Sequence, residues 1–104
     1  MKQHEYQITV QHVKDANGQA STYTEALQFQ AFNHDDIFKV FRRVKDANLV
    51  DEESAKAFAV GLKLFGEVLL ENKDVPLFKE FFPDFLKFMK ALKNQVKSQT
   101  EVKG

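Results

Sequence analysis

The sequence predicts an α+β fold in which an N-terminal antiparallel β-hairpin packs on a layer of three to four α-helices. The first observation is that apolar and polar residues alternate in two segments before residue 33, as in half-buried strands. The second is that apolar residues after residue 36 recur at spacings of three and four, which is typical of amphipathic helices. Eleven phenylalanines and no tryptophan in 104 residues indicate dense apolar packing.

The hairpin prediction depends on two segments of period two on either side of Asn17-Gly18. The first runs from His4 to Val10 and the second from about Tyr23 to Phe32. Asn-Gly tolerates the positive φ angles of a two-residue hairpin loop, so paired residue numbers should sum to 35. The predicted partners are Ile8 with Leu27, Tyr6 with Phe29, and His4 with Ala31. This register makes the apolar faces of the strands coincide, and a bulge within Gln19–Thr22 is the alternative that would shift it.

A first helix is predicted to begin after Asn33. With Asn33 as N-cap, Asp36 falls at position N3 of a capping-box-like arrangement. Phe32 and Ile37 then occupy the two positions of a hydrophobic staple. Asn48 is suited to the left-handed conformation that ends many helices.

A second helix is predicted over Asp51–Asn72. Apolar residues surround most of its circumference, which indicates a central helix packed on two or more sides. Gly61 and Gly66 lie inside it, and each costs about 1 kcal/mol relative to alanine. Two interpretations stay open for these glycines: close approach of a neighbouring helix or sheet, or a notch for a ligand or partner.

The last helical region is predicted to break or kink at Pro83, which lacks an N–H and clashes with the preceding turn. We expect a short helix over Val75–Phe81 and a longer one over Pro83–Lys97. Residues 98–104 are expected to form a frayed polar tail. The chain as a whole is predicted to be one globular domain over residues 1–97.

A group of phenylalanines around Pro83 is the main candidate site. Its members lie within eleven residues: Phe78, Phe81, Phe82, Phe85 and Phe88. Packing in the core is one interpretation. The other is that, together with Gly61 and Gly66, they form an apolar pocket or a patch that is buried against a partner or a second copy.

A stripe of lysines on another side of the last helix is a candidate anion-binding site. Its members are Lys87, Lys90, Lys93 and Lys97. A solvated helix face is the simpler interpretation. Nucleic-acid binding is not favoured, because the net charge is zero and the two arginines, Arg42 and Arg43, lie on another helix.

The sequence contains no constellation typical of catalysis. Cysteine is absent, so thiolate metal sites and disulfides are excluded. His34, Asp35 and Asp36 point about 100° apart on a helix and do not converge on one metal ion. We therefore expect no enzymatic activity, no cofactor and no metal. Without a signal-peptide core or a run of about 18 apolar residues, a cytoplasmic protein with no membrane contact is expected.

Several stretches resemble one known family. They are HEYQITV, NHDDIF, AFAVGLKLFGEVLL, and PLF followed by FMKALK. In this order, over roughly residues 1–93, the chain resembles a family of small bacterial proteins catalogued as domain of unknown function 3861. The resemblance implies a bacterial cytoplasmic protein of about this size. It implies no activity and no site residues.

The functional hypothesis is a non-enzymatic interaction module. We expect it to form a homo-oligomer, most simply a dimer, or to bind another protein, through the phenylalanine-rich helices or the edge of the hairpin. The alternative is a protein that binds a small apolar ligand in a phenylalanine-lined pocket between the helices.

Overall fold

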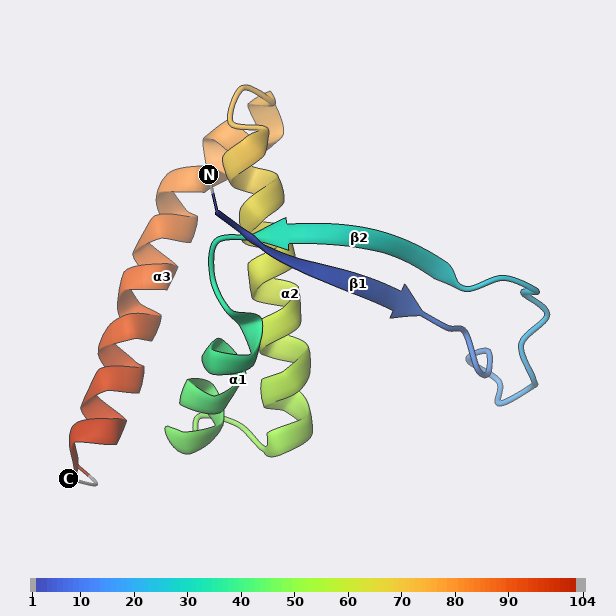
Figure 1. Cartoon of the computed structure of the whole chain (residues 1–104), viewed down its shortest axis with the longest axis horizontal. Coiled ribbons are helices and arrows are strands. Elements are labelled where there is room, and N and C mark those ends of the chain that lie inside the picture. Colours follow the sequence, from blue (N-terminus) through green and yellow to red (C-terminus); the bar gives the residue numbers. More distant parts are fainter. Residues whose placement is uncertain (1, 103–104) are drawn as a thin grey trace. The chain divides into compact units, whose positions relative to one another are not determined.

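The computed structural model describes residues 2–102, with side chains over residues 2–97. A two-stranded hairpin precedes three helices, which confirms the α+β class (Figure 1). The elements are β1 (His4–Val10), β2 (Leu27–Asn33), α1 (Ile37–Asp46), α2 (Glu52–Glu71) and α3 (Pro76–Val102). The hairpin, within residues 1–34, and the helices, within residues 35–104, form two compact units. The packing of the hairpin on the helices and the single domain over residues 1–97 stay predictions.

The strands of the hairpin are antiparallel, as predicted, but their register is different. Ile8 pairs with Phe29 and Tyr6 with Ala31, so paired residue numbers sum to 37 rather than to 35. The predicted partners were therefore wrong by two positions. Because side chains alternate with a period of two, a shift of two positions keeps the apolar faces of both strands together.

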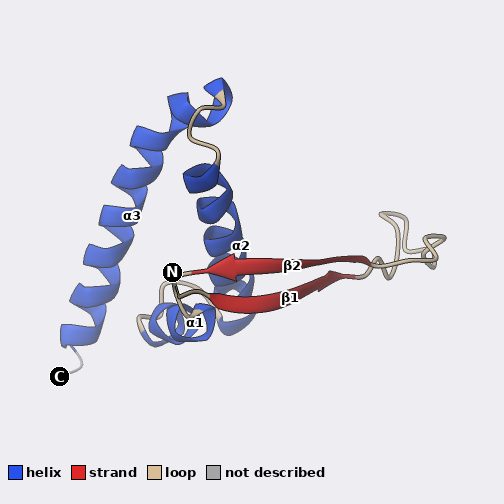
Figure 2. Cartoon of the chain, turned by 45° about the horizontal axis from the view of Figure 1, so that its top comes forward, coloured by secondary structure: helices blue, strands red, loops and turns tan. Residues whose placement is uncertain are grey.

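The cause of the shift lies in the turn and in the stretch that follows it (Figure 2). The loop does not have two residues: the Asp15 N–H donates to the Gln19 carbonyl at 2.8 Å, and Gly18 has a φ of 85°. The Asp15 carboxylate accepts hydrogen bonds from the N–H groups of Asn17 and Gln19 at 2.9 and 2.8 Å. These bonds define a three-residue loop with glycine in the left-handed position.

The two sides of the hairpin have different numbers of residues between the loop and the regular ladder. Lys14 bridges Ala20 next to the loop, and the regular ladder begins where Val10 pairs with Leu27. Between these pairs lie three residues on the first side, 11–13, and six on the second side, 21–26. The three additional residues set the register, and the Asn-Gly signal alone does not reveal them.

Helix α1 begins at Ile37 with Asp36, not Asn33, as its N-cap. The Asp36 carboxylate accepts hydrogen bonds from the N–H groups of Phe38 and Lys39 at 3.0 and 3.4 Å. The predicted capping box and staple are wrong because Asn33 is the last residue of β2, where it pairs with His4. At the other end, Asn48 has a φ of 55° and its N–H donates to the Lys45 carbonyl, which confirms the left-handed end of this helix.

Helix α2 has the predicted bounds, since Asp51 is the N-cap of a helix that ends at Glu71. It lies alongside α1 (Figure 1). Helices α1, α2 and α3 and the turn after α1 supply the buried apolar residues. They are Ile37, Val44, Ala47, Ala55, Ala59, Leu69 and Phe85.

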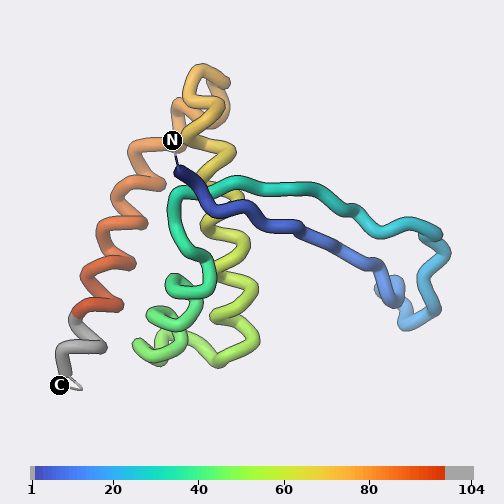
Figure 3. Tube along the Cα trace, viewed as in Figure 1, coloured from blue at the N-terminus to red at the C-terminus, as the bar shows by residue number. Residues whose placement is uncertain are grey.

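Helix α3 is continuous through Pro83, so the predicted break is wrong. Proline removes only one hydrogen bond, to the Lys79 carbonyl, and its ring displaces that carbonyl. The helix continues on both sides of Pro83, and the path of α3 bends near its beginning in Figure 3. The backbone of α3 runs to Val102. The predicted polar tail therefore overlaps the end of α3, and its last two residues, 103–104, lie outside the described residues.

Candidate functional site

The phenylalanines of α3 that contact α2 include one buried member, Phe85. Its side chain is 8 % exposed. Its ring lies edge-on to the ring of Phe65 on α2, with centroids 6.0 Å apart, and within 6.3 and 6.4 Å of Phe81 and Phe82. Offset and edge-on ring pairs at these distances are favourable. Phe85 therefore anchors α3 on α2.

Of the two predicted glycines, only Gly66 lies at a helix contact. The Cζ atom of Phe85 is 3.0 Å from the position of a Cβ atom on Gly66. Gly61 is exposed, and nothing lies within 4 Å of its Cβ position. The structure thus supports close approach of a neighbouring helix for Gly66 and gives no packing reason for Gly61.

The other phenylalanines of the cluster are only partly covered. Phe78 and Phe82 are half-buried, whereas Phe81 and Phe88 are exposed. Leu77, Phe81 and Phe88 follow spacings of four and seven, which places them on one face of α3. Phe65 of α2 continues this face, since its ring centroid is 6.1 Å from that of Phe81. We call these four residues the exposed helical face.

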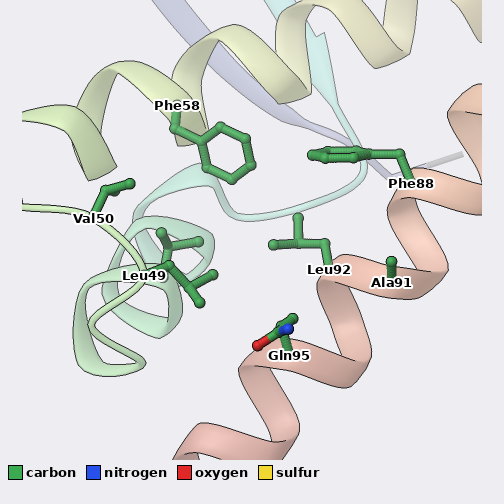
Figure 4. A pocket seen from close by; sticks show the side chains of 8 residues that line it. Leu49, Val50, Phe58, Phe88, Ala91, Leu92 and Gln95 are labelled. Atoms are coloured by element: carbon green, nitrogen blue, oxygen red, sulfur yellow. The ribbon is translucent and has the colours of Figure 1, made fainter.

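An apolar cleft of about 250 Å³ opens between the three helices (Figure 4). Its lining comes from α1, the turn after it, α2 and α3: Val44, Leu49, Val50, Phe58, Phe88, Ala91, Leu92 and Gln95. Phe58 and Phe88 meet edge-on across it, with centroids 6.2 Å apart. Gln95 is the only lining residue with a polar side chain.

This cleft is not where the sequence placed a pocket. It shares only Phe88 with the predicted set, and the ring of Phe85 occupies the space beside Gly66. Leu49 and Val50 were not among the predicted site residues. An available signal was that both apolar residues follow the left-handed Asn48, where helix ends often make a hydrophobic contact.

All four predicted lysines, Lys87, Lys90, Lys93 and Lys97, are exposed on α3. They lie outside the lining of the apolar cleft. Exposure suits both a solvated face and an anion site, so anion binding stays a prediction.

Among the ion pairs of the helical unit, one is partly shielded from solvent. The clearest pair joins the Lys63 ammonium to the Asp35 carboxylate at 2.7 Å, and the Lys63 side chain is only 16 % exposed. The hydrogen bond from Ser54 lowers the pKa of Asp51, the N-cap of α2. The hydrogen bond and charge of Glu53 raise the pKa of Lys56.

Metal sites and membrane-spanning helices are both absent from the described part of the chain. No group of three or more histidine, aspartate or glutamate side chains there is arranged to hold a metal ion. None of the helices over residues 2–102 combines the length and apolar character needed to cross a membrane.

A comparison with known protein families supports the resemblance that the sequence motifs indicate. A family model described as a domain of unknown function, DUF3861, matches residues 4–94. The chain belongs to this family. The match covers the hairpin, all of α1 and α2, and most of α3, and it confirms the resemblance noted from the sequence.

A solved crystal structure has the same fold as this chain. It is the crystal structure of a protein of unknown function from Pectobacterium atrosepticum, which is 39 % identical with a TM-score of 0.74. The alignment covers 89 % of this chain and 99 % of that one. A comparison with curated proteins found no match. The family model and the related crystal structure thus establish the fold, and neither has an assigned activity.

Proposed function

We propose that this protein is a non-enzymatic interaction module that self-associates. One observation carries the proposal: Phe65 and Phe81 are in ring contact, yet they are 46 % and 43 % exposed. Leu77 and Phe88 extend this exposed helical face along α3. Contiguous apolar surface of this kind is uncommon on monomeric proteins and marks interaction sites.

A second copy is the partner that fits best. Aromatic residues are enriched in the centres of interfaces, where they contribute much of the binding free energy. The formal net charge is zero, so no overall repulsion opposes the approach of two copies. An isologous contact would bury the exposed helical face of each copy at once.

Sedimentation velocity over a wide concentration range tests this proposal on the full chain. We expect the wild type to form dimers and Phe81→Ser to raise the dimer dissociation constant by about tenfold or more. Phe38→Ser is the matched control, because Phe38 is also exposed but lies on α1 outside this face. Circular dichroism checks that both variants fold. A wild type that stays monomeric at every concentration would refute the proposal.

The apolar cleft favours a second candidate function, the binding of a small apolar ligand. Its lining is apolar except for Gln95, which could orient one polar group of a ligand. The probe is 1-anilinonaphthalene-8-sulfonate, whose fluorescence rises in apolar sites. Ala91→Phe should fill the cleft and abolish the rise, whereas Asn94→Phe, an exposed neighbour outside the lining, should not. Equal fluorescence from both variants would exclude the cleft as the site.

A further inference from the structure

Strand β2 has one edge that no strand covers. Over residues 2–102 the sheet contains two strands, so β2 pairs with β1 on one side only. The sequence of β2, LQFQAFN, contains no charged residue and no proline. Natural proteins usually protect free edges with charges, proline or bulges, because the unpaired N–H and C=O groups recruit further strands. Strand β2 has none of these protections.

The apolar face of the hairpin is also largely uncovered. Val10 and Leu27, which pair with each other, are 55 % and 66 % exposed, and Phe29 is 43 % exposed. A two-stranded sheet is marginal in water by itself, and a wider sheet with a continuous apolar face is more stable. The free edge and the exposed face together favour the addition of strands.

We propose that β2 pairs antiparallel with β2 of a second copy, about a two-fold axis that passes through Gln30. The result is a four-stranded sheet in the order β1-β2-β2-β1. This inference rests on the self-association proposed above. It adds a second contact between the two copies, at the free edge of β2. An antiparallel pair of identical strands is isologous, so the contact closes at two copies.

The sequence of β2 is complementary to itself in one register. When the paired residue numbers sum to 60, residues 28–32 of β2, which are all exposed or half-buried, have a partner, which provides about four to six hydrogen bonds. The pairs across the axis are Gln28 with Phe32, Phe29 with Ala31, and Gln30 with Gln30. Leu27, Phe29 and Ala31 stay on one face, so the apolar surfaces of both hairpins become continuous. No like charges meet in this register.

The outer edge of β1 is less suited to the same contact. Glu5 lies within β1 and Lys2 lies just before it, and charged side chains on an edge strand oppose strand addition. The exposed helical face and β2 must also share one two-fold axis in a dimer. Two isologous contacts about different axes would instead build open assemblies.

Single cysteine variants of the full chain test the proposal, because the natural sequence contains no cysteine. Gln30→Cys and Gln7→Cys are a matched pair: Gln7 and Gln30 are both exposed and are direct cross-strand partners. Across the proposed axis the Cα atoms of residue 30 lie about 4.5–5.5 Å apart, within the range of a disulfide. The two copies of residue 7 would be three strand spacings apart, about 14 Å, beyond that range.

We expect mild oxidation to give a disulfide-linked dimer with Gln30→Cys and none with Gln7→Cys. As a second measurement, Gln30→Lys should raise the dimer dissociation constant about threefold or more, because two lysines would lie directly opposite each other. Gln7→Lys should leave that constant unchanged.

The possible failures can be told apart. A dimeric wild type in which Gln7→Cys cross-links instead, or in which neither Gln30 variant has its effect, would overturn the β2 contact and leave self-association standing. Wild-type assemblies larger than a dimer would overturn the proposal that both contacts share one two-fold axis. A monomeric wild type would overturn both proposals.

Discussion

The ring of Phe85 occupies the space above Gly66, with its Cζ atom 3.0 Å from where a Cβ atom would lie. A Cβ atom on Gly66 would require this ring to shift by a few tenths of an ångström. The glycine therefore lets a buried phenylalanine of α3 approach the backbone of α2, and this contact anchors the phenylalanine cluster to the rest of the helical unit.

Gly61→Ala and Gly66→Ala should differ in their effect on stability. In an open helix position, alanine gains about 1 kcal/mol over glycine, so we expect Gly61→Ala to stabilise the protein by up to this amount. At Gly66 the same gain is opposed by contact with a buried ring, and the variant should be less stable than Gly61→Ala by about 1 kcal/mol or more. Chemical denaturation measures both. Equal stabilisation would mean that Phe85 moves aside freely.

Phe85→Ala and Phe81→Ala should separate the buried from the exposed part of the cluster. Removing the ring of Phe85 leaves a cavity, for which we expect a loss of about 3 kcal/mol in the free energy of unfolding. Phe81 is 43 % exposed, so removing its ring should lower the free energy of unfolding by about 1 kcal/mol at low protein concentration, where self-association does not contribute. A larger loss for Phe81 than for Phe85 would contradict the assignment of Phe85 as the anchor.

The pair between Lys63 and Asp35 should contribute more to stability than the exposed pair between Lys56 and Glu53. The Lys63 side chain is 16 % exposed and Lys56 is 51 % exposed. Solvent screens the second pair, so we expect a coupling free energy of about 1 kcal/mol for the first and a clearly smaller one for the second. Double-mutant cycles with Asp35→Asn, Lys63→Gln, Glu53→Gln and Lys56→Gln provide both values. Equal couplings would contradict this ranking.

Stability in acid should depend in part on Asp51. Its hydrogen bond with Ser54 lowers the pKa of its carboxyl group in the folded state, below the ordinary value of about 3.9. The ionised cap therefore stabilises the protein fully above that ordinary value, and this contribution is lost as the pH falls through the lower folded-state pKa. Asp51→Asn keeps a capping oxygen that does not titrate.

Denaturation of the wild type and Asp51→Asn between pH 7 and pH 2 measures this effect. We expect the stability of the wild type to fall relative to that of the variant below about pH 4. Parallel pH profiles for the two proteins would show that the cap does not titrate in this range.

Local patterns predicted the start of α2 and the end of α1, where the deciding residues are neighbours in the sequence. Asp51 caps α2 through Ser54, three residues away, and Asn48 ends α1 through Lys45, also three residues away. The predicted cap of α1 was wrong because Asn33 suits both a helix cap and a strand. Asn33 pairs with His4, 29 residues distant, and so belongs to β2, and Asp36 is the N-cap instead.

The candidate site was predictable only in part. The phenylalanines stood out by their density, but their spacing in α3 could not reveal that only Phe85 is buried. That depends on the position of Phe65 and Gly66, which belong to another helix. The lining of the apolar cleft joins residues up to 51 positions apart, from Val44 to Gln95, and no local pattern connects them.

By itself, the sequence determined the class of fold, the two strands, the position of the central helix and the membership in the DUF3861 family. These follow from periodicity, caps and motifs, which act over a few residues. The register of the hairpin and the division of the phenylalanines into buried and exposed members were decided by tertiary structure. Each of these depends on which distant segments compete for the same hydrogen bonds or the same space, and that competition is settled only when the chain is folded.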